Sequence, residues 1–245
     1  MLFRSHSGFV SQQTGGSILG DKARMDQLAA HKSAYIRTTP AASTLGGVAQ
    51  NTRSSILFCE AAGFDIILVE TVGVGQNELD VHEMVDALLL LQLPGGGDEI
   101  QGIKRGLLEV ADALLINKAD GAQAPLAKKS QQYFKAATHG FRPRENGWEP
   151  PVLLASALEN RGIKEAWQHI ETFISLQKKQ GDFEQKRTHQ KIQGLQKSIG
   201  HRLEEAFFAD EWVQKELPDI KRQLINGSIS ISEATKILIE GFRSH

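Results

Sequence analysis

Asn117, Lys118 and Asp120 directly follow the apolar run ALLI and belong to the tetrapeptide N-K-A-D. An ionised carboxylate only accepts hydrogen bonds, so Asp120 suits the N1–H and exocyclic amine of guanine, a pair of donors that adenine lacks. The Asn117 amide suits the O6 and N7 acceptors of the same base, and the aliphatic stem of Lys118 can lie over the ring. The tetrapeptide predicts a guanine-binding loop, although the same residue types also occur by chance in a solvated turn.

A second polar segment, Ser156–Leu158, follows the apolar run PVLLA. Small residues at a strand end, here Ser156 and Ala157 before Leu158, let backbone N–H groups approach a purine carbonyl oxygen. The segment begins roughly 40 residues after Asn117, which leaves space for one helix between them. If both segments end parallel strands, their loops lie side by side at one edge of the sheet. We therefore expect them to act on one base.

A third segment, ILVETVGVGQNE, carries groups suited to phosphate and Mg²⁺. Glu70 closes an apolar run, and the N–H of Gly73 can meet a γ-phosphate while Glu70 holds Mg²⁺ through water or orients the attacking water. Asp21, in GGSILGDKARM, is a second candidate for Mg²⁺. Lys104 lies in a glycine-rich loop over 94–106 whose composition is typical of a mobile switch. Taken singly, each segment is also compatible with an ordinary turn or surface loop.

The elements that must position these residues are a series of short apolar runs separated by amphipathic stretches. The runs are nearly continuous rather than alternating, as in parallel strands that are buried on both faces. The stretches over 44–62, 123–138 and 162–180 have the pattern of helices. This succession predicts an α/β fold with a doubly wound, mostly parallel sheet. The runs lie at 34–38, 65–70, 87–93, 113–118 and 151–157.

From residue 181 onward the sequence predicts helices alone. Apolar residues spaced three or four apart form one helical face. They are Ile192, Leu195, Ile199, Leu203 and Phe207. Two more helices are expected over 211–225 and 232–242. The residues leave two readings of this tail open, a helical cap on the α/β domain or an arm for dimerisation or partner docking.

Local signals mark the ends of these last two helices. Asn226-Gly227 predicts a turn between them, and Ser230 or Ser232 can cap the last helix. Pro218 is expected to kink or restart the helix over 211–225.

Composition is typical of an ordinary globular protein, with 40% hydrophobic and 23% charged residues. A formal net charge of −1 gives no indication of a nucleic-acid or membrane partner, and the longest apolar run is too short to span a bilayer. The single cysteine, Cys59, excludes an intramolecular disulfide and favours a reducing, cytoplasmic setting. It lies within an expected helix, where buried packing is its expected role. Residues 1–14 have neither a signal-peptide pattern nor a good strand pattern, and we expect a poorly ordered head.

Six segments, in this order along the chain, resemble the methylmalonyl-CoA mutase-associated GTPases. This is the MeaB/ArgK-type family of metallochaperones, also called lysine/arginine/ornithine transport ATPases. The resemblance runs from about Gly15 to the C-terminus, and six motifs in order are far more specific than any one. The segments are GGSILGDKARM, RTTPAASTLGGVA, VETVGVGQNE, PGGGDEIQGIKRG, NKAD and SALENRGI.

The resemblance implies a P-loop GTPase that protects an adenosylcobalamin-dependent acyl-CoA mutase and gates its cofactor loading. It implies a GTPase domain over 15–180 and a helical region over 181–245 that forms a homodimer. By position, Asp21 and Glu70 correspond to Mg²⁺-site residues, Gly73 to a γ-phosphate contact and Lys104 to a switch residue that the mutase helps to position. Asn117, Lys118 and Asp120 would read guanine, backed by Ser156–Leu158, so GTP or GDP with Mg²⁺ are the expected ligands.

The chain departs from the family pattern in one respect that bears on activity. No G-x-x-x-x-G-K-[ST] motif occurs in the sequence, and the first strand and the aspartate that ends the second strand are missing from it too. We interpret the chain as an N-terminally truncated copy with weak or no nucleotide binding. A paralogue that has lost hydrolysis is the second interpretation.

Three functions therefore remain open from the sequence. The first is a GTP-hydrolysing chaperone of an acyl-CoA mutase. The second is a non-catalytic interaction protein that dimerises through its helical arm and docks a mutase or a full-length sister chain. The third is an ATP-using transport-associated kinase, which Asp120 disfavours because a carboxylate facing N1 penalises adenine.

Overall fold

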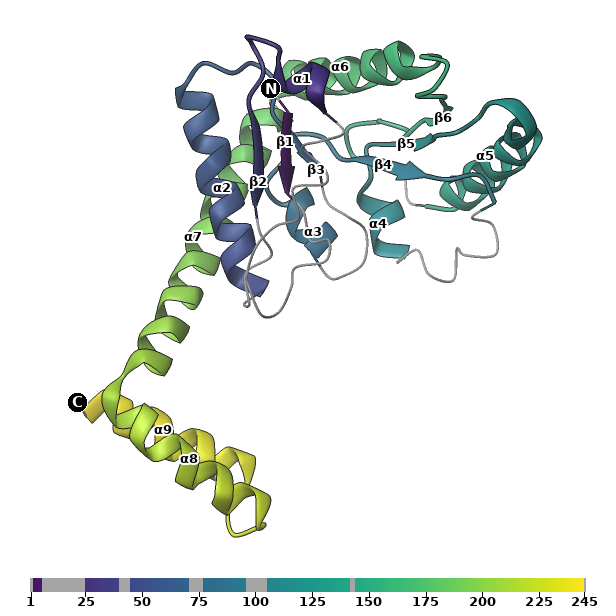
Figure 1. The fold of residues 1–245 in the computed structure, drawn as a ribbon. Coiled ribbons are helices and arrows are strands. Elements are labelled where there is room, and N and C mark those ends of the chain that lie inside the picture. Colours follow the sequence, from purple (N-terminus) through teal and green to yellow (C-terminus); the bar gives the residue numbers. More distant parts are fainter. Residues whose placement is uncertain are drawn as a thin grey trace. The chain divides into compact units, whose positions relative to one another are not determined.

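The protein is described by a computed structural model over residues 2–5, 25–39, 45–70, 77–95, 105–141 and 144–244. Its contacts divide the chain into two compact units, residues 1–193 and 194–245 (Figure 1). The strands are β1 (Leu2–Ser5), β2 (Ile36–Thr39), β3 (Leu68–Glu70), β4 (Leu89–Gln92), β5 (Ala113–Ile116) and β6 (Val152–Leu154). The helices are α1 (Asp26–Ala29), α2 (Leu45–Ala61), α3 (Asn77–His82), α4 (Arg105–Val110), the 3-10 helix η3 (Gly121–Gln123), α5 (Ala124–His139), α6 (Ile163–Gln180), α7 (Asp182–Ala209), α8 (Glu211–Ile225) and α9 (Ile231–Ser244).

The strands of the first unit form two parallel ladders, ordered β2-β1-β3 and β4-β5-β6. All five strands expected from the apolar runs are present, although each is shorter than its run. The parallel α/β architecture predicted from the sequence is thus confirmed.

β1 corrects the expectation for the first residues of the chain. Leu2–Ser5 forms a strand that pairs in parallel with β2 on one side and β3 on the other, with Leu2 opposite both Ile36 and Leu68. The expectation that this part of the head forms no strand was wrong. The segment LFRS is four residues long and contains no continuous apolar run, so its pattern gives no strand signal. The rest of residues 1–14 lies outside the described residues.

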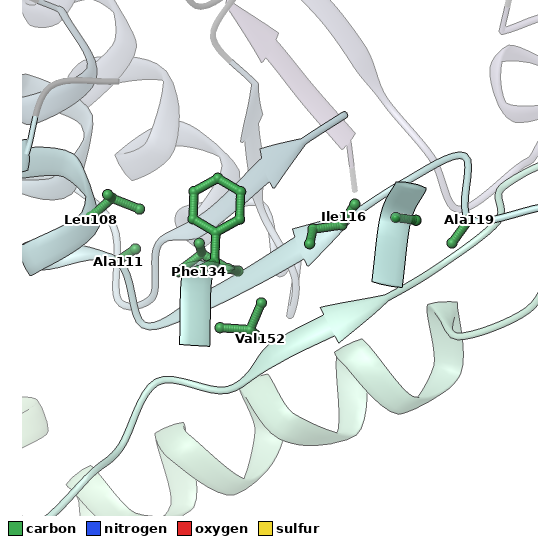
Figure 2. Packing of buried hydrophobic residues seen from close by; sticks show 8 residues of the cluster. Leu108, Ala111, Ile116, Ala119, Phe134 and Val152 are labelled. Atoms are coloured by element: carbon green, nitrogen blue, oxygen red, sulfur yellow. The ribbon is translucent and has the colours of Figure 1, made fainter. Parts of the chain in front are cut away.

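β5 is buried on both faces, as its continuous apolar sequence predicts. Leu114 and Ile116 pack against Phe134 of α5 in the largest apolar cluster of the described residues (Figure 2). Leu115, whose side chain points to the opposite face, packs with Ala166 of α6. Helices therefore cover both faces of this ladder, which holds the carboxyl ends of β5 and β6 in fixed register.

A buried polar network fixes the amino end of β5. The Asp112 carboxylate is almost fully buried; it accepts a 2.8 Å hydrogen bond from the Leu88 N–H and pairs with the Arg144 guanidinium. Arg144 also donates to the Ala111 carbonyl at 2.6 Å, and the Trp148 indole N–H donates to the Asp112 carbonyl at 2.8 Å. The amino ends of β4 and β5 are thereby tied to the segment that leads into β6.

The first turns of α7 are anchored to the first unit by polar contacts. Arg187 makes two hydrogen bonds to the Asp86 carboxylate, at 2.8 and 2.6 Å, and these bonds raise the pKa of Arg187. Lys186 donates to the Asp86 carbonyl at 2.9 Å, and burial lowers the pKa of Lys186. Burial, with the Lys186 charge as the next cause, also lowers the pKa of His82. The start of α7 therefore belongs to the α/β unit, and the rest of α7 belongs to the second unit.

The second unit comprises the end of α7 with α8 and α9, which lie side by side in Figure 1 and share a small apolar core. Ser230 caps α9: its hydroxyl accepts from the Glu233 N–H at 3.1 Å, and the Glu233 carboxylate accepts from the Ser230 N–H, so a capping box confirms one of the two predicted caps. Pro218 lies inside α8, which runs unbroken from Glu211 to Ile225. The prediction that Pro218 restarts this helix was wrong, because the buried face formed by Val213 and Ile220 continues across it.

Two further expectations concern the burial of Cys59 and the absence of a helix that could span a membrane. Cys59 is buried within α2, as predicted, and burial raises the pKa of its thiol. Among the helices of the described ranges, none has the length and apolarity needed to cross a membrane.

Candidate functional site

The two polar segments predicted to act together lie at adjacent strand ends. The Asn117 N–H donates to Gln92 O and the Ala155 N–H donates to Ile116 O, each at 2.9 Å. Just beyond the strands, the Ala119 N–H donates to Ala155 O, also at 2.9 Å. The loop after β5 and the loop after β6 are therefore joined by backbone hydrogen bonds at one edge of the ladder.

Asn117 links the two loops through its side chain. Its Oδ1 accepts a 3.1 Å hydrogen bond from the Ala157 N–H, across forty positions of sequence. Because the backbone partner is a donor, the acceptor end of the amide must face it, and the donor Nδ2 is the end left for a ligand. A donor in this orientation suits acceptors such as O6 and N7 of guanine.

Lys118 has a left-handed backbone, with φ of +57°. This conformation costs a residue with a side chain about 1 kcal/mol, so the surrounding contacts must hold it in place. The turn at Lys118 allows the next residue, Ala119, to bond back to Ala155 just after β6, while the Lys118 side chain stays exposed.

Asp120 is extended and half-buried at the start of η3. Its carbonyl accepts from the Gln123 N–H at 3.0 Å, but its carboxylate does not cap the helix. An Asp at such a position ordinarily serves as the cap. The loop thus offers an acceptor-only carboxylate and an amide donor, which match the two kinds of group on the edge of guanine.

The three residues of the second loop have different surroundings. Ser156 is fully buried, and its hydroxyl accepts from the Glu159 N–H at 3.0 Å. Ala157 uses its N–H on Asn117. Leu158 is 88% exposed. Ser156 therefore shapes the loop from inside, and Ala157 and Leu158 form its outer part.

Sequence reasoning missed two residues of this loop, Arg161 and Gly162. Arg161 exchanges two backbone hydrogen bonds with Ser156, at 2.9 and 3.0 Å, and its guanidinium donates to Ala119 O at 2.7 Å. Gly162 has φ of +77° and packs directly on the end of β6. The signal was the triplet N-R-G within SALENRGI, but nothing in its spacing shows the contact to Ala119.

Of the residues predicted to serve phosphate and Mg²⁺, the structure describes only Glu70. Glu70 ends β3 opposite Arg4 of β1, so it lies at a carboxyl strand end as expected. Asp21, Gly73 and Lys104 lie outside the described residues. Within the described ranges, no group of three or more His, Cys, Asp or Glu side chains is arranged to hold a metal ion.

Comparison with known proteins identifies one family over most of the chain. The profile of the family described as "Methylmalonyl Co-A mutase-associated GTPase MeaB" matches residues 9–211. GTPase ArgK of Escherichia coli is 45% identical over 201 residues, which make up 82% of this chain and 61% of that protein. The Mus musculus protein named "Methylmalonic aciduria type A homolog, mitochondrial" is 39% identical over 231 residues, 94% of this chain and 56% of its own length.

A solved structure, that of an LAO/AO transport system kinase, has the same fold. It superposes with a TM-score of 0.72 at 32% sequence identity, covering 99% of this chain and 71% of that one. The chain thus spans between 56% and 71% of the three proteins compared.

Proposed function

Because the chain belongs to the family of methylmalonyl-CoA mutase-associated GTPases, we propose that it reads guanine with the loops after β5 and β6. In this proposal it is a GTP-hydrolysing chaperone that protects an adenosylcobalamin-dependent acyl-CoA mutase and gates its cofactor loading. The observation that carries the base-binding part is the hydrogen bond from the Ala157 N–H to Asn117 Oδ1. It leaves Asn117 Nδ2 and the Asp120 carboxylate as the donor and acceptor of one loop.

The roles proposed for the remaining residues follow from their places in the motifs of the family. Mg²⁺ would be held by Asp21 and Glu70 and would neutralise charge on the phosphates. Gly73 would donate its N–H to the γ-phosphate, and Lys104 would act from the switch loop when the mutase is bound. Catalysis would be electrostatic, because phosphoryl transfer depends mainly on positioning and charge stabilisation.

For a polypeptide of these 245 residues alone, we propose a low nucleotide affinity, since the sequence contains no Walker A motif. Such a loop supplies several backbone N–H groups and a lysine to the phosphates, and charge-assisted hydrogen bonds contribute about 1.5–3 kcal/mol each. Four of them amount to at least about 6 kcal/mol, or more than about 10⁴-fold in affinity. Base contacts through Asn117 and Asp120 do not compensate for a difference of this size.

Ligand-observed NMR tests the base site at millimolar nucleotide, where weak binding is measurable. With Mg²⁺ present, we expect saturation transfer to GDP to exceed transfer to ADP. Asp120→Asn replaces one acceptor oxygen by an N–H donor and should shift the preference toward XDP, whose C2 carbonyl accepts a hydrogen bond. Equal signals from GDP and ADP would count against the proposal. Tight, low-micromolar GDP binding in calorimetry would instead show that the phosphates are held by groups other than a Walker A loop.

A second candidate, the non-catalytic interaction protein, is favoured by the exposed apolar face of α7. Leu195, Ile199 and Leu203, spaced as on one helical face, are 61%, 50% and 59% exposed. We propose that this face is buried in a homodimer. Sedimentation of the chain and of Ile199→Lys tests this point, since the variant should be monomeric if the face forms the interface.

GTP hydrolysis with and without the mutase separates the two candidates. Mutase-stimulated hydrolysis supports the first, and binding to the mutase without hydrolysis supports the second. The single cysteine leads us to place either protein in the cytoplasm. An ATP-using kinase, as the name of the solved structure suggests for that protein, would require a preference for ADP over GDP that the Asp120 carboxylate disfavours.

A further inference from the structure

Arg161 connects the two loops of the candidate base site through its side chain. One guanidinium nitrogen, Nη2, donates to the Ala119 carbonyl at 2.7 Å, and Nη1 lies 3.0 Å from Glu159 Oε2. The backbone of Arg161 is fixed independently, since its N–H and C=O both bond to Ser156. The guanidinium therefore extends from a rigid part of the second loop to the first.

The carbonyl that Arg161 contacts belongs to the peptide that carries Asp120. Ala119 is buried, and a buried carbonyl requires a hydrogen-bond partner. Its N–H donates to the carbonyl of Ala155, the residue after β6, so Ala119 is held by Ala155 on one side and by Arg161 on the other. Two fixed points on one residue set the position of the following Cα, which belongs to Asp120.

We propose that Arg161 is a positioning residue for guanine specificity, acting on Asp120 through the Ala119 carbonyl. This inference rests on the proposed base site but adds a residue that does not contact the base. The planar guanidinium can serve Ala119 and Glu159 at once from two nitrogens, whereas a lysine ammonium is a single point charge on a flexible stem. The Glu159 pair is largely exposed and contributes little by itself, so the Ala119 contact is the one that matters.

GDP and IDP provide the test, because IDP lacks the exocyclic amine and keeps only the N1–H for Asp120. Their affinities are measured by ligand-observed NMR titration for the unmodified chain, Arg161→Ala, Arg161→Lys and Glu159→Ala. We expect Arg161→Ala to lower the preference for GDP over IDP by up to about tenfold, the effect of one charge-assisted hydrogen bond on a partly exposed group. Arg161→Lys should restore part of the preference. Glu159→Ala removes the ion pair but keeps the Ala119 contact, so it should leave the preference unchanged.

Amide hydrogen exchange of residues 117–120 provides a second readout that requires no ligand. Arg161→Ala should speed exchange of the Ala119 N–H, and Glu159→Ala should not. If the unmodified chain prefers GDP and Arg161→Ala keeps that preference, the inference is overturned while the proposed function stands. If the unmodified chain does not distinguish GDP from ADP, the proposed base site fails. In that case, unchanged exchange of the Ala119 N–H in Arg161→Ala would also overturn the inference that Arg161 holds Ala119 in place. Faster exchange would show that Arg161 holds Ala119 but has no role in base specificity.

Discussion

Gly162 is the residue of the candidate site at which a single methyl group should have the largest effect. It precedes α6 and has φ of +77° and ψ of −7°. A Cβ built there would lie 2.2 Å from the Leu154 carbonyl oxygen, well inside the 3.0 Å that such contacts keep. The neighbour is backbone at the end of β6, so it cannot turn aside as a flexible side chain would.

Two penalties determine the cost of Gly162→Ala. The left-handed backbone costs an alanine about 1–2 kcal/mol. Forcing a methyl group into a closely packed position costs about 1–3 kcal/mol more, through shifts of the surrounding backbone. We therefore expect Gly162→Ala to lower the free energy of unfolding by about 2–5 kcal/mol. The loop over 156–161 should shift as well, so that the preference for GDP falls.

Gly181 offers a matched control, because its backbone is nearly the same and its surroundings are open. It has φ of +85° and ψ of −3° at the end of α6, and a methyl group added there would meet no atom of the described residues within 4 Å beyond its chain neighbours. Gly181→Ala should cost only the conformational part, about 1–2 kcal/mol. Urea unfolding followed by circular dichroism measures both variants. Equal losses of stability would refute the argument that close approach to Leu154 requires glycine at position 162.

Three other predictions concern pH, a buried ion pair and the strained lysine. Burial lowers the pKa of His82, so near neutral pH the unfolded chain binds more protons than the folded one. Stability should therefore fall as pH drops below the ordinary value of 6.5, and His82→Gln should flatten that slope when urea unfolding is measured across this pH range. Asp112→Ala leaves the Arg144 guanidinium without its carboxylate and should lower the free energy of unfolding by about 3–5 kcal/mol in urea. In a double-mutant cycle, the effects of Asp112→Ala and Arg144→Ala should not add. Lys118→Gly relieves a positive φ and should raise the melting temperature slightly, whereas the GDP signal in NMR should weaken because the stem over the base is gone.

The sequence was sufficient to locate most elements, for a physical reason. Strands buried on both faces need apolar residues at successive positions, and ALLI at 113–116 has them, so the run itself identifies β5. The helices α5 and α6 follow from their amphipathic patterns in the same way. Because the strands are parallel, the adjacency of the loops at Asn117 and Ala157 also followed from the order of elements.

What the sequence did not show are contacts whose partners lie far apart in the chain. Arg161 bonds to Ala119 across 42 positions, and Arg144 pairs with Asp112 across 32. Neither pair has a fixed spacing or a periodic pattern, since each depends on two segments that the ladder brings together. β1 was missed for a related reason, because its place between β2 and β3 depends on pairing with strands that lie far along the chain.

Asn117 illustrates how one side chain serves both the scaffold and recognition, and a single substitution can separate the two. In Asn117→Asp one carboxylate oxygen can still accept from the Ala157 N–H, so the loops should stay joined and the stability should change little. The other oxygen replaces the Nδ2 donor and would face O6 and N7, which are acceptors too. We therefore expect near-normal urea unfolding together with loss of GDP binding in NMR. Loss of both stability and GDP binding would show that Asn117 holds the loop without reading the base. Retention of both stability and GDP binding would show that its Nδ2 does not contact guanine.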